Sequence, residues 1–520
     1  MTDAAAQTEA KSGPVLAADG RPLKASLRRA LRAQKMRALL LIAPLLLFIM
    51  ITFIMPIADM LFRSVENQIV SETLPRTVVA LEDWEDHDQP PSEDVYAALY
   101  YDLFEAAEFR IHSRVGSRLN YEMTGVSSLF RQSGRGVGRF DTDIYTDQFT
   151  ELNADWADPR VWATLMEDES VRAALPETAS AYDGWVNVTI EANEDDPLEE
   201  DVEDYVYTAL YRDLAARGYD GSNAMLSEAA EAVGAFETVS LREQFAEIDE
   251  DWLDPEVFET IWVYSPNYTA GYFLTAVDLQ LTADGIEPQS EDLRVYLTLF
   301  KRTMFMSLVI MGSCVLLGYP IAFLLANLPM RISNILLILV LLPFWTSLLV
   351  RTSAWKVLLQ QQGVINDILV WIGLVADNDR LALINNQTGT IIAMTHILLP
   401  FMILPLYSVM QTIPPSYVRA AKSLGATDWT AFWRVYFPQS VPGIGAGCIL
   451  VFILAIGYYI TPELVGGRTG TFISNRIAYH ISTSLNWGLA AALGSILLIL
   501  VLALYWAYDR IVGIDNVKLG

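Results

Sequence analysis

Two carboxylates and several aromatic side chains stand at the ends of long apolar runs, where charged residues are costly and often functional. Glu463 follows Thr461-Pro462, and Asp59 lies near the end of the first run. Carboxylates bordered by aromatic rings suit a cationic solute, because both attract positive charge. The candidate rings are Tyr458, Tyr459, Trp345 and Trp355. Two other interpretations stay open: the rings could be anchors at a membrane interface, and Glu463 could make a structural contact at a helix end.

No other pattern in the chain predicts catalysis. The sequence has no G-x-x-x-x-G-K-[ST] loop for phosphate, so any ATP that drives its function is hydrolysed by another chain. The four histidines lack the spacing of metal ligands: His87, His112, His396 and His480. The stretch DTDIYTD begins like a calcium loop but lacks the glycine and the glutamate that such a loop needs. We therefore expect no enzyme activity, no cofactor and no metal site.

Long apolar runs predict six membrane-spanning helices, because a bilayer needs about 20 apolar residues per helix. The six expected spans are 38–62, 303–328, 332–350, 389–411, a segment within 435–462, and 486–508. Four prolines lie in or beside these runs: Pro320, Pro343, Pro400 and Pro462. Neighbouring helices can satisfy the carbonyl groups that proline frees, so we interpret these residues as kinks rather than span ends.

Basic residues that flank the spans predict their orientation. The tail formed by residues 1–37 precedes the first span, and its basic flank next to the span consists of Lys24, Arg28, Arg29, Arg32, Lys35 and Arg37. By the positive-inside rule this tail is cytosolic, and six spans return the carboxyl terminus to the cytosol. The predicted cytosolic segments hold 14 Lys and Arg, against 5 in the two short outer loops. The first run is longer than the apolar core of a cleavable signal peptide, which has about 7–15 residues.

Residues 64–296 form an acidic segment between the first two spans. From Ser64 to Tyr296 the chain has 51 Asp and Glu against 13 Arg and no Lys, a net charge of −38. The rest has 11 acidic against 22 basic residues, a net charge of +11. The predicted orientation places the acidic segment outside the membrane, in the periplasm. The acid run 194–205 is expected to be a solvated loop or face.

This acidic segment contains two homologous units, at about residues 74–167 and 175–263. The matched stretches are 95–103 (VYAALYYDL) with 206–214 (VYTALYRDL), and 147–162 (DQFTELNADWADPRVW) with 243–258 (EQFAEIDEDWLDPEVF). The spacing of their apolar residues predicts units that are mostly helical. The segment is therefore a duplicated helical domain.

The repeated DW-x-DP motif predicts both helix starts and core positions. The second aspartate of each motif, Asp158 or Asp254, is expected to cap a helix that begins at the following proline. Trp156 and Trp252 are expected to be buried, because repeated aromatic residues usually mark shared packing. Contact with a ligand is the alternative for these two rings.

A polar stretch, residues 411–441, interrupts the apolar runs and is predicted to lie in the cytosol. Ser416 is expected to cap a short helix that Gly425 ends, because glycine adopts the left-handed conformation that stops a helix. Asp428 is expected to cap a second helix, which Pro438 ends. That second helix is expected to pack one apolar face on membrane-buried helices. The face consists of Trp429, Phe432, Trp433 and Tyr436.

This stretch resembles the cytosolic coupling loop of ABC-importer permeases, whose pattern is Glu-Ala-Ala, three residues, Gly, and a proline-rich end. The residues that carry the resemblance are Arg419, Ala420, Ala421, Gly425, Pro438, Pro442 and Gly443. The resemblance implies that residues 412–444 dock into a groove of an ATPase subunit. Arg419 stands where the family pattern has Glu, which removes that carboxylate while the small pair and the glycine remain.

Further stretches look like permeases of the spermidine/putrescine group: LLPFWTSLLVRTSAW, LPFMILPLYSVM, YITPELVGG and SLNWGLAAAL. The resemblance covers residues 36–63 and 297–515, and the acidic segment lies outside it. It implies an all-α polytopic membrane protein with six transmembrane helices of the ABC-importer permease type, which carries the duplicated extracytoplasmic insertion. It also implies uptake of polyamines, or of another small solute, into the cytoplasm with energy from a separate ATPase.

The same resemblance implies the assembly in which the chain works. The expected partners are an ABC ATPase subunit, a second permease subunit that is either identical or different, and a periplasmic solute-binding protein. The expected location is the lipid of a bacterial inner membrane. Nucleic acid is not an expected partner, because the polar stretch lacks a basic recognition face. A membrane-anchored receptor with an acidic ectodomain and a secondary transporter are the rival interpretations, and neither needs a coupling loop.

Overall fold

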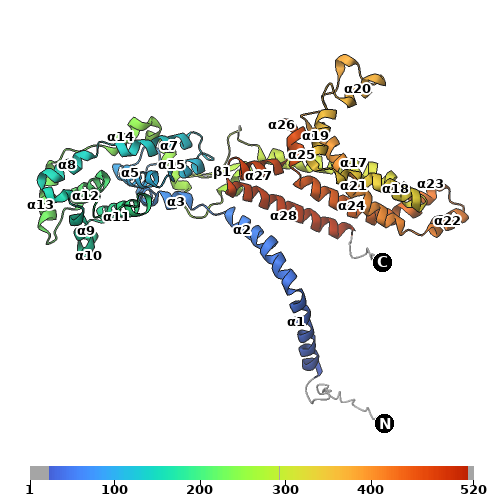
Figure 1. Ribbon diagram of the computed structural model, residues 1–520, viewed down its shortest axis with the longest axis horizontal. Helices are drawn as coiled ribbons and strands as arrows, with labels where there is room; N and C mark the ends of the chain where they lie inside the picture. Colours follow the sequence, from blue (N-terminus) through green and yellow to red (C-terminus); the bar gives the residue numbers. More distant parts are fainter. Residues whose placement is uncertain (1–22, 292, 513–520) are drawn as a thin grey trace, which may run out of the picture. The chain divides into compact units, whose positions relative to one another are not determined.

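A computed structural model describes residues 23–291 and 293–512, so the first 22 residues of the expected cytosolic tail lie outside it. The chain divides into two compact units, Met1–Arg63 and Ser64–Gly520. Within the described residues the fold is helical apart from one β-hairpin (Figure 1). Five helices there are long and apolar enough to cross a membrane, or six if one bent pair counts as a single span. The predicted all-α polytopic fold is confirmed.

The first unit is one long helix with a π turn in it. α1 (Leu23–Ile49), η1 (Met50–Ile54) and α2 (Met55–Arg63) follow one another without a break. Residues Gln34–Arg63 form a candidate span that contains the expected 38–62. The π turn directly precedes Pro56, whose ring would clash with the carbonyl group four residues back in a regular α-helix.

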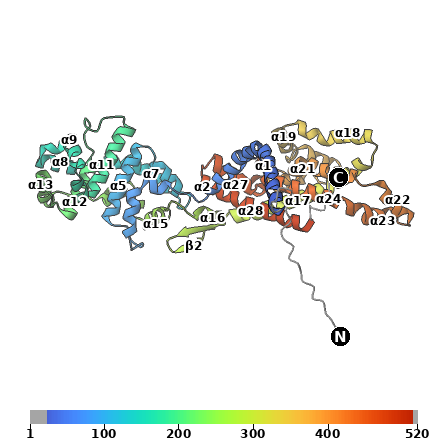
Figure 2. The same ribbon diagram turned by 90° about the horizontal axis from the view of Figure 1, so that it is seen from below.

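Short helices build the acidic insertion, and a β-hairpin follows them (Figures 1 and 2). The helices are α3 (Ile69–Thr73), α4 (Pro75–Ala80), η2 (Leu81–Asp83), α5 (Glu93–Glu108), α6 (His112–Leu119), α7 (Val126–Gly136), η3 (Val137–Arg139), α8 (Asp143–Leu152), η4 (Ala154–Ala157), α9 (Pro159–Glu167), α10 (Glu169–Ala174), α11 (Pro176–Asn187), η5 (Val188–Ala192), α12 (Asp204–Arg217), α13 (Ala224–Ala232), η6 (Val233–Ala235), α14 (Leu241–Ile248), η7 (Glu250–Leu253), α15 (Pro255–Val263) and α16 (Gly271–Thr275). The antiparallel hairpin joins β1 (Leu279–Thr282) to β2 (Gly285–Pro288).

The expected caps and core residues of the DW-x-DP motifs are confirmed. Asp158 accepts from the backbone N–H of Arg160 at 2.9 Å, and Asp254 accepts from that of Glu256 at 3.0 Å. α9 and α15 each begin at the proline that follows the capping residue. Both tryptophan side chains of the motifs are fully buried. Most of the acid run 194–205 is an exposed loop, as predicted.

Each repeat packs part of its chain against the other repeat. Tyr96, from the first repeat, donates to the carbonyl of Trp252 in the second at 2.7 Å. Tyr207, from the second repeat, donates to the carbonyl of Trp156 in the first at 2.7 Å. Trp252 also packs on Phe130, with ring centroids 5.5 Å apart. We call residues 75–140 with 241–263 the first lobe, and residues 143–236 the second lobe. Each lobe thus combines one half of either repeat.

This packing brings the two ends of the lobes together. The backbone N–H of Asn67 donates to the carbonyl of Asn267 at 2.8 Å, and Thr269 donates to the carbonyl of Val65 at 2.9 Å. Asn67 also donates through its side chain to the Tyr264 carbonyl at 2.6 Å. The chain therefore enters and leaves the pair of lobes at neighbouring points.

Two equivalent acids of the repeats, Asp102 and Asp213, are both buried and accept from an equivalent threonine. Asp102 accepts from the backbone and hydroxyl of Thr77, both at 2.8 Å, and from Arg76 at 3.1 Å. Asp213 accepts from the backbone and hydroxyl of Thr178, both at 2.8 Å. Burial raises the pKa of Asp102 to about 7, although Arg76 and Thr77 act to lower it. The shared Thr–Asp contact supports the duplication.

Long helices form the core that follows the insertion. They and their connections are α17 (Tyr296–Asn327), α18 (Met330–Leu341), η8 (Leu342–Trp345), α19 (Leu348–Leu358), α20 (Val364–Trp371), η9 (Asp377–Asp379), α21 (Gln387–Gln411), α22 (Pro415–Ser423), α23 (Asp428–Ala431), η10 (Phe432–Tyr436), α24 (Phe437–Gly457), α25 (Ile460–Val465), α26 (Gly467–Gly470), α27 (Ile473–Ser482) and α28 (Trp487–Val512). α17, α21 and α24 share one buried apolar cluster. A Cβ on Gly447 would lie 2.5 Å from the Met402 sulfur, so this glycine allows α21 and α24 to approach closely.

The third expected span, 332–350, is not one straight helix. Met330–Trp345 and Leu348–Leu358 are bent by 94° at a short break. Pro343 lies in the 3₁₀ turn η8 at this break, and Ser347 caps α19 by accepting from the backbone N–H of Val350. Pro343 thus lies at a sharp bend, and its interpretation as a kink within one span stays a prediction, whereas Pro320 and Pro400 lie inside continuous helices.

Buried polar contacts join the insertion to the core. Asp278 caps α17 by accepting from the backbone N–H groups of Tyr296 at 2.8 Å and Leu297 at 3.0 Å. Tyr121, which follows α6, donates to the carbonyl of Ser484, which follows α27. Apolar contacts between α16, α17, α27 and α28 surround this junction. The insertion is thus packed against the core at this junction.

Candidate functional site

The polar stretch 411–441 forms a short helix and a tight turn at one end of the core. α22 begins at Pro415 with Pro414 as its cap, so the expected cap at Ser416 was wrong. Pro415 suits the first position of the helix for two reasons. Its φ angle is already helical, and it has no N–H group, which the first turn would leave unpaired. The N–H groups of Gly425 and Ala426 donate to the carbonyls of Lys422 and Ala421, and Gly425 has a φ of 91°. Gly425 therefore has the predicted left-handed conformation.

The second helix of this stretch is the beginning of a long helix. Residues Asp428–Gly457 form one candidate span through α23, the π turn η10 and α24. Pro438 lies in the first turn of α24, so the expected helix end at Pro438 was wrong. The π turn carries the backbone past this residue, which has no N–H to donate. Thr427 caps the helix by accepting from Thr430, so the expected cap at Asp428 was also wrong; Asp428 instead pairs with Lys422.

Burial divides the residues of the expected coupling loop into two groups. Arg419, Ala420 and Gly425 are exposed, and Ala421 is half-buried. Leu424, beside them, is 89% exposed. Pro438 is exposed, but Pro442 is half-buried within α24. Gly443 is buried there, where an added Cβ would lie 3.0 Å from the Cβ of Val409 on α21. The first group forms a surface, whereas the last two residues belong to helix packing.

The expected aromatic face divides in the same way. Phe432 packs edge-on against the rings of Tyr319 and Phe323 on α17, with centroids 6.2 and 5.7 Å apart. Tyr436 packs edge-on against Phe323 at 5.1 Å. Trp429 and Trp433 stay 71% and 44% exposed. Half of the face thus holds the helix on the core, and the other half continues the exposed surface of α22.

At the other end of the core a break in the backbone follows α24. Asn475 of α27 donates to the Tyr459 carbonyl at 2.9 Å and to Oε2 of Glu463 at 2.6 Å, and Ser474 donates to the Tyr458 carbonyl at 2.8 Å. These bonds satisfy carbonyl groups that the break frees. The side chains of Glu463 and Tyr459 are exposed, and Tyr458 is half-buried.

Polar contacts hold α19 against this break. Thr352 and Thr461, both fully buried, share a hydroxyl hydrogen bond of 3.1 Å between α19 and α25. Trp355 donates through its indole nitrogen to Nδ1 of His396 on α21 at 3.1 Å. The structure therefore places Trp355 on a helix packed beside Tyr458, Tyr459 and Glu463.

Among the contacts just described, none involves Trp345 or Asp59. Trp345, in η8, is 75% exposed. Asp59 belongs to the first unit, where it pairs with Arg63 at 2.9 Å. Sequence reasoning missed Asn475, Thr352 and His396, which make the contacts just described. A polar residue in an apolar run is a signal for His396, but no sequence spacing connects α27 to α25.

The two groups of candidate residues lie at opposite ends of the core. Both views show α22 and α23 at one end of the long helices and α27 at the other (Figures 1 and 2). This separation agrees with the prediction that the polar stretch and the segment after α24 face opposite sides of a membrane.

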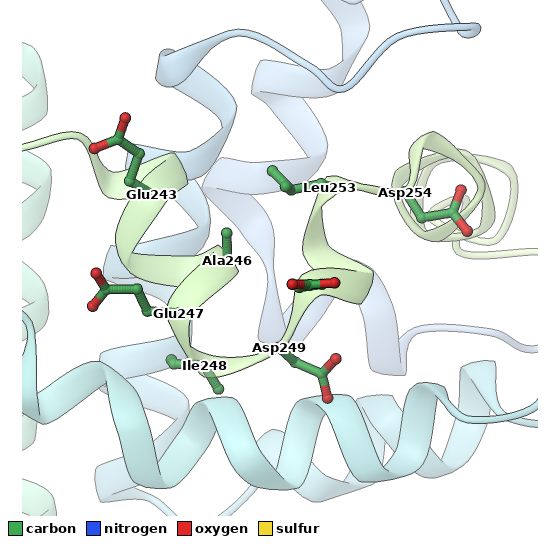
Figure 3. A pocket seen from close by; sticks show the side chains of 8 residues that line it. Glu243, Ala246, Glu247, Ile248, Asp249, Leu253 and Asp254 are labelled. Atoms are coloured by element: carbon green, nitrogen blue, oxygen red, sulfur yellow. The ribbon is translucent and has the colours of Figure 1, made fainter.

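The insertion carries a separate acidic hollow on its first lobe, formed by α14, η7 and the start of α15. Figure 3 shows carboxylates around it, with apolar side chains between them. The lining residues are Glu243, Ala246, Glu247, Ile248, Asp249, Glu250, Leu253 and Asp254. Among the residues that the structure describes, no group of acids, histidines and cysteines is arranged to hold a metal ion.

Comparison with known proteins gives consistent matches to the core. The model of the family described as "binding-protein-dependent transport system inner membrane component" matches residues 318–512. The spermidine/putrescine transport system permease protein PotB of Salmonella typhimurium (strain SL1344) is 35% identical over 222 residues, which are 42% of this chain and 77% of that protein. PotB of Escherichia coli (strain K12) is 34% identical over 222 residues and 80% of its length.

Other matches are more distant. The inner membrane ABC transporter permease protein YdcU of Escherichia coli (strain K12) is 32% identical over 259 residues, which are 47% of this chain and 80% of that protein. Among solved structures, a chain of a bacterial alginate ABC transporter in complex with an alginate pentasaccharide-bound periplasmic protein is similar, with a TM-score of 0.35 and 21% identity. That match covers 43% of this chain and 78% of the other.

Proposed function

Because this chain belongs to the family of binding-protein-dependent transport system inner membrane components, as a permease subunit of an ABC importer, we propose that it moves polyamines such as spermidine and putrescine into the cytoplasm. The observation that supports this substrate class most is the match to PotB across the core. The exposed carboxylate of Glu463 beside Tyr458 and Tyr459 is the chemistry that a chain of ammonium groups and methylenes would use. Energy comes from ATP hydrolysis by a separate subunit.

Residues 412–444 are proposed as the segment that couples the permease to that ATPase. Arg419, Ala420, Ala421 and Gly425 would be the surface that docks, because α22 leaves them at the surface and the turn at Gly425 holds them in place. The exposed rings of Trp429 and Trp433 continue this surface. Arg419 is positively charged where the family pattern has a carboxylate, so it would contact an acidic or neutral residue of the ATPase.

The segment around the break after α24 is proposed as the outer end of the solute path. Glu463 would bind an ammonium group there, and Tyr458, Tyr459 and Trp355 would border it. The bond from Asn475 orients Oε2 of Glu463, while the side chain itself stays exposed. Asp59, in the first unit, and the exposed Trp345 stay predicted residues of the path.

The proposed orientation follows from the flanking charges and from the two opposite groups of residues. Both termini and residues 412–444 face the cytosol, and the insertion, residues 64–296, faces the periplasm. Residues 1–37 form the cytosolic tail, residues 38–62 form the first span, and residues 297–515 form the rest of the permease core. A periplasmic solute-binding protein would deliver substrate to the outer side, and a second permease subunit would complete the path.

Uptake by a reconstituted complex tests the proposed substrate. The complex purified through this chain, with ATP enclosed in proteoliposomes and its binding protein outside, should accumulate radiolabelled spermidine, and excess putrescine should compete. Omission of ATP should abolish accumulation. Uptake of another solute by the same vesicles, with no ATP-dependent accumulation of spermidine or putrescine, would contradict the proposal.

A further inference from the structure

Arg351 is a cation that the chain leaves without a partner in the core. It lies in the first turn of α19, directly after the 94° bend. Its Nε and Nη1 atoms are buried and have no hydrogen-bond acceptor among residues 23–291 and 293–512. Over the same residues the ion pairs of the core are those of Arg380 with Asp367 and Asp377 and of Lys422 with Asp428, none of which includes Arg351.

The helix that carries Arg351 is held in place. The next residue, Thr352, is bonded to buried Thr461 of α25, and Trp355 one turn later is bonded to His396 of α21. The guanidinium group is near enough to His396 and Tyr458 to act on both electrostatically. Arg351 therefore lies at the junction of α19, α21 and the break after α24, next to the proposed outer end of the path.

Guanidinium nitrogens that are buried without an acceptor are costly, so the two nitrogens of the partly exposed Arg351 favour a partner. Carboxylate is its best partner, because the planar fork of N–H donors matches two carboxylate oxygens. The carboxylate of the same region in this chain, Glu463, is held by Asn475 instead. Asp59 of the first unit is held as well, by its ion pair with Arg63. An acceptor from a partner subunit would complete Arg351.

The source of that carboxylate follows from the surface around α19. A polyamine has no carboxylate to offer. Trp345, just before α19, is 75% exposed, and Tyr459, in the break after α24, is 46% exposed, so the segments that meet at this junction carry exposed aromatic rings. A second permease subunit is the partner that would cover such a surface at the path, because aromatic residues and arginine are enriched in the cores of protein interfaces.

We propose that Arg351 pairs with a carboxylate of the second permease subunit and that this ion pair closes the outer end of the path until an ammonium group of the substrate replaces the guanidinium group. The ion pair itself requires two permease subunits, and it does not depend on which solute they transport. The replacement step rests on the proposed function, because it needs a cationic substrate. Arg351 thus acts as a resident cation that the substrate must displace.

Zero-length cross-linking in the full complex tests the ion pair. In the Arg351→Lys variant, dicyclohexylcarbodiimide adds to the partner carboxylate, the new amine attacks the activated carbonyl carbon, and dicyclohexylurea leaves as the amide forms. We expect a product with the summed mass of the two permease subunits, whose linked peptide joins position 351 to an Asp or Glu of the second subunit. The Arg351→Gln complex, treated in the same way, is the control; it keeps Lys356 on the same helix but has no amine at position 351.

Two further measurements test the displacement. Saturating spermidine, added before the carbodiimide, should reduce the cross-linked product by more than half. In reconstituted vesicles Arg351→Gln should lower spermidine uptake at least about thirtyfold, as the loss of one partner of a buried charge pair does, and Arg351→Lys should restore most of it.

The outcomes separate the two ideas. A product linked only within this chain, or no product in an assembled Arg351→Lys complex that still transports, would overturn the ion pair. A cross-link that spermidine leaves unchanged would overturn the displacement. A cross-link to the second subunit in a complex that transports another solute but no polyamine would contradict the proposed function while it supports the ion pair.

Discussion

The insertion and the membrane core differ in how many of their apolar and polar side chains find partners within the same region. In the insertion the largest rings, such as Trp156 and Trp252, are fully buried, and tyrosines from one repeat bond to backbone of the other. In the core Leu424 and Trp429 are 89% and 71% exposed, and two nitrogens of Arg351 are buried without an acceptor among the described residues. The insertion is therefore built to fold by its own contacts, whereas the core is built to be completed by lipid and by partner subunits.

The largest effect is expected where the core meets its proposed ATPase. Gly425→Asp places a side chain at a φ of 91°, which costs roughly 1 kcal/mol or more, and adds a charge to the docking surface. ATP-driven uptake should fall at least about tenfold, as for loss of a central interface residue, while the protein still inserts in the membrane.

A matched glycine separates docking from backbone strain. Gly373 also has a positive φ, 78°, and open space around its Cβ position, but it lies in the segment between α20 and α21. Gly373→Asp should leave uptake within about twofold of wild type, because this residue lies outside the proposed docking surface. Equal loss in both variants would mean that Gly425 acts through folding alone.

Removal of the lobes tests the independence of the insertion. Asn67 and Asn267 are already bonded, so a short Gly-Ser linker can replace residues 70–263 without moving the ends. The core should still insert. The insertion has a net charge of −38, and its electric field could concentrate polycations near the outer side. In that case removal of the lobes should lower uptake at low spermidine concentration several-fold. The loss should be smaller at high salt, because charges are then screened beyond roughly 3 Å.

Solubility alone is the other explanation for that charge. In that case uptake at low spermidine would be unchanged at every salt concentration, and only the tendency of the protein to aggregate would increase. Uptake curves for the shortened and full-length complexes at two ionic strengths distinguish the explanations.

A smaller effect is expected at the other end of the core. Glu463→Gln keeps the shape and the acceptor for Asn475 but removes the charge. The KM for spermidine should rise about threefold to fivefold, since a partly exposed charge contributes up to about 1 kcal/mol. Asp379→Asn, an exposed acid in η9, is the control and should have no effect. An unchanged KM for Glu463→Gln would show that this charge is not on the path.

The smallest effect concerns one hydroxyl group in the insertion. Trp252 donates to the Ser133 hydroxyl at 2.8 Å, but the indole nitrogen of Trp156 has no partner among the described residues. Trp156 and Trp252 are equivalent residues of the two repeats, and the same offset in sequence makes Ala229 the equivalent of Ser133. The alanine side chain has no oxygen that could accept from Trp156. Ala229→Ser should raise the free energy of unfolding by about 1 kcal/mol, and Ser133→Ala should lower it similarly.

Chemical denaturation followed by tryptophan fluorescence measures both variants. A loss of stability in Ala229→Ser would contradict the equivalence of the two lobes, because an added hydroxyl without its expected partner is destabilising.

Local signals in the sequence predicted the parts of the structure that depend on local physics. The caps Asp158 and Asp254, the turn at Gly425 and the apolar spans follow from neighbouring residues, and the structure has them. The contact between Trp156 and Tyr207 joins residues far apart in the chain, which spacing alone cannot reveal. The caps at Pro414 and Thr427 were misplaced because adjacent residues competed for the position, and the 94° bend between η8 and α19 accompanies a contact of α19 with α25 that is distant in sequence.

Retention of the ATPase by three forms of the full complex tests the central contrast most directly. The wild-type chain, purified by an affinity tag in mild detergent, should bring an ABC ATPase subunit that mass spectrometry identifies and that hydrolyses ATP. The form without residues 70–263 should retain as much of it, because the lobes lie outside the docking surface. Gly425→Asp should retain at least about tenfold less. Full retention by Gly425→Asp, together with loss in the form without the lobes, would contradict the account.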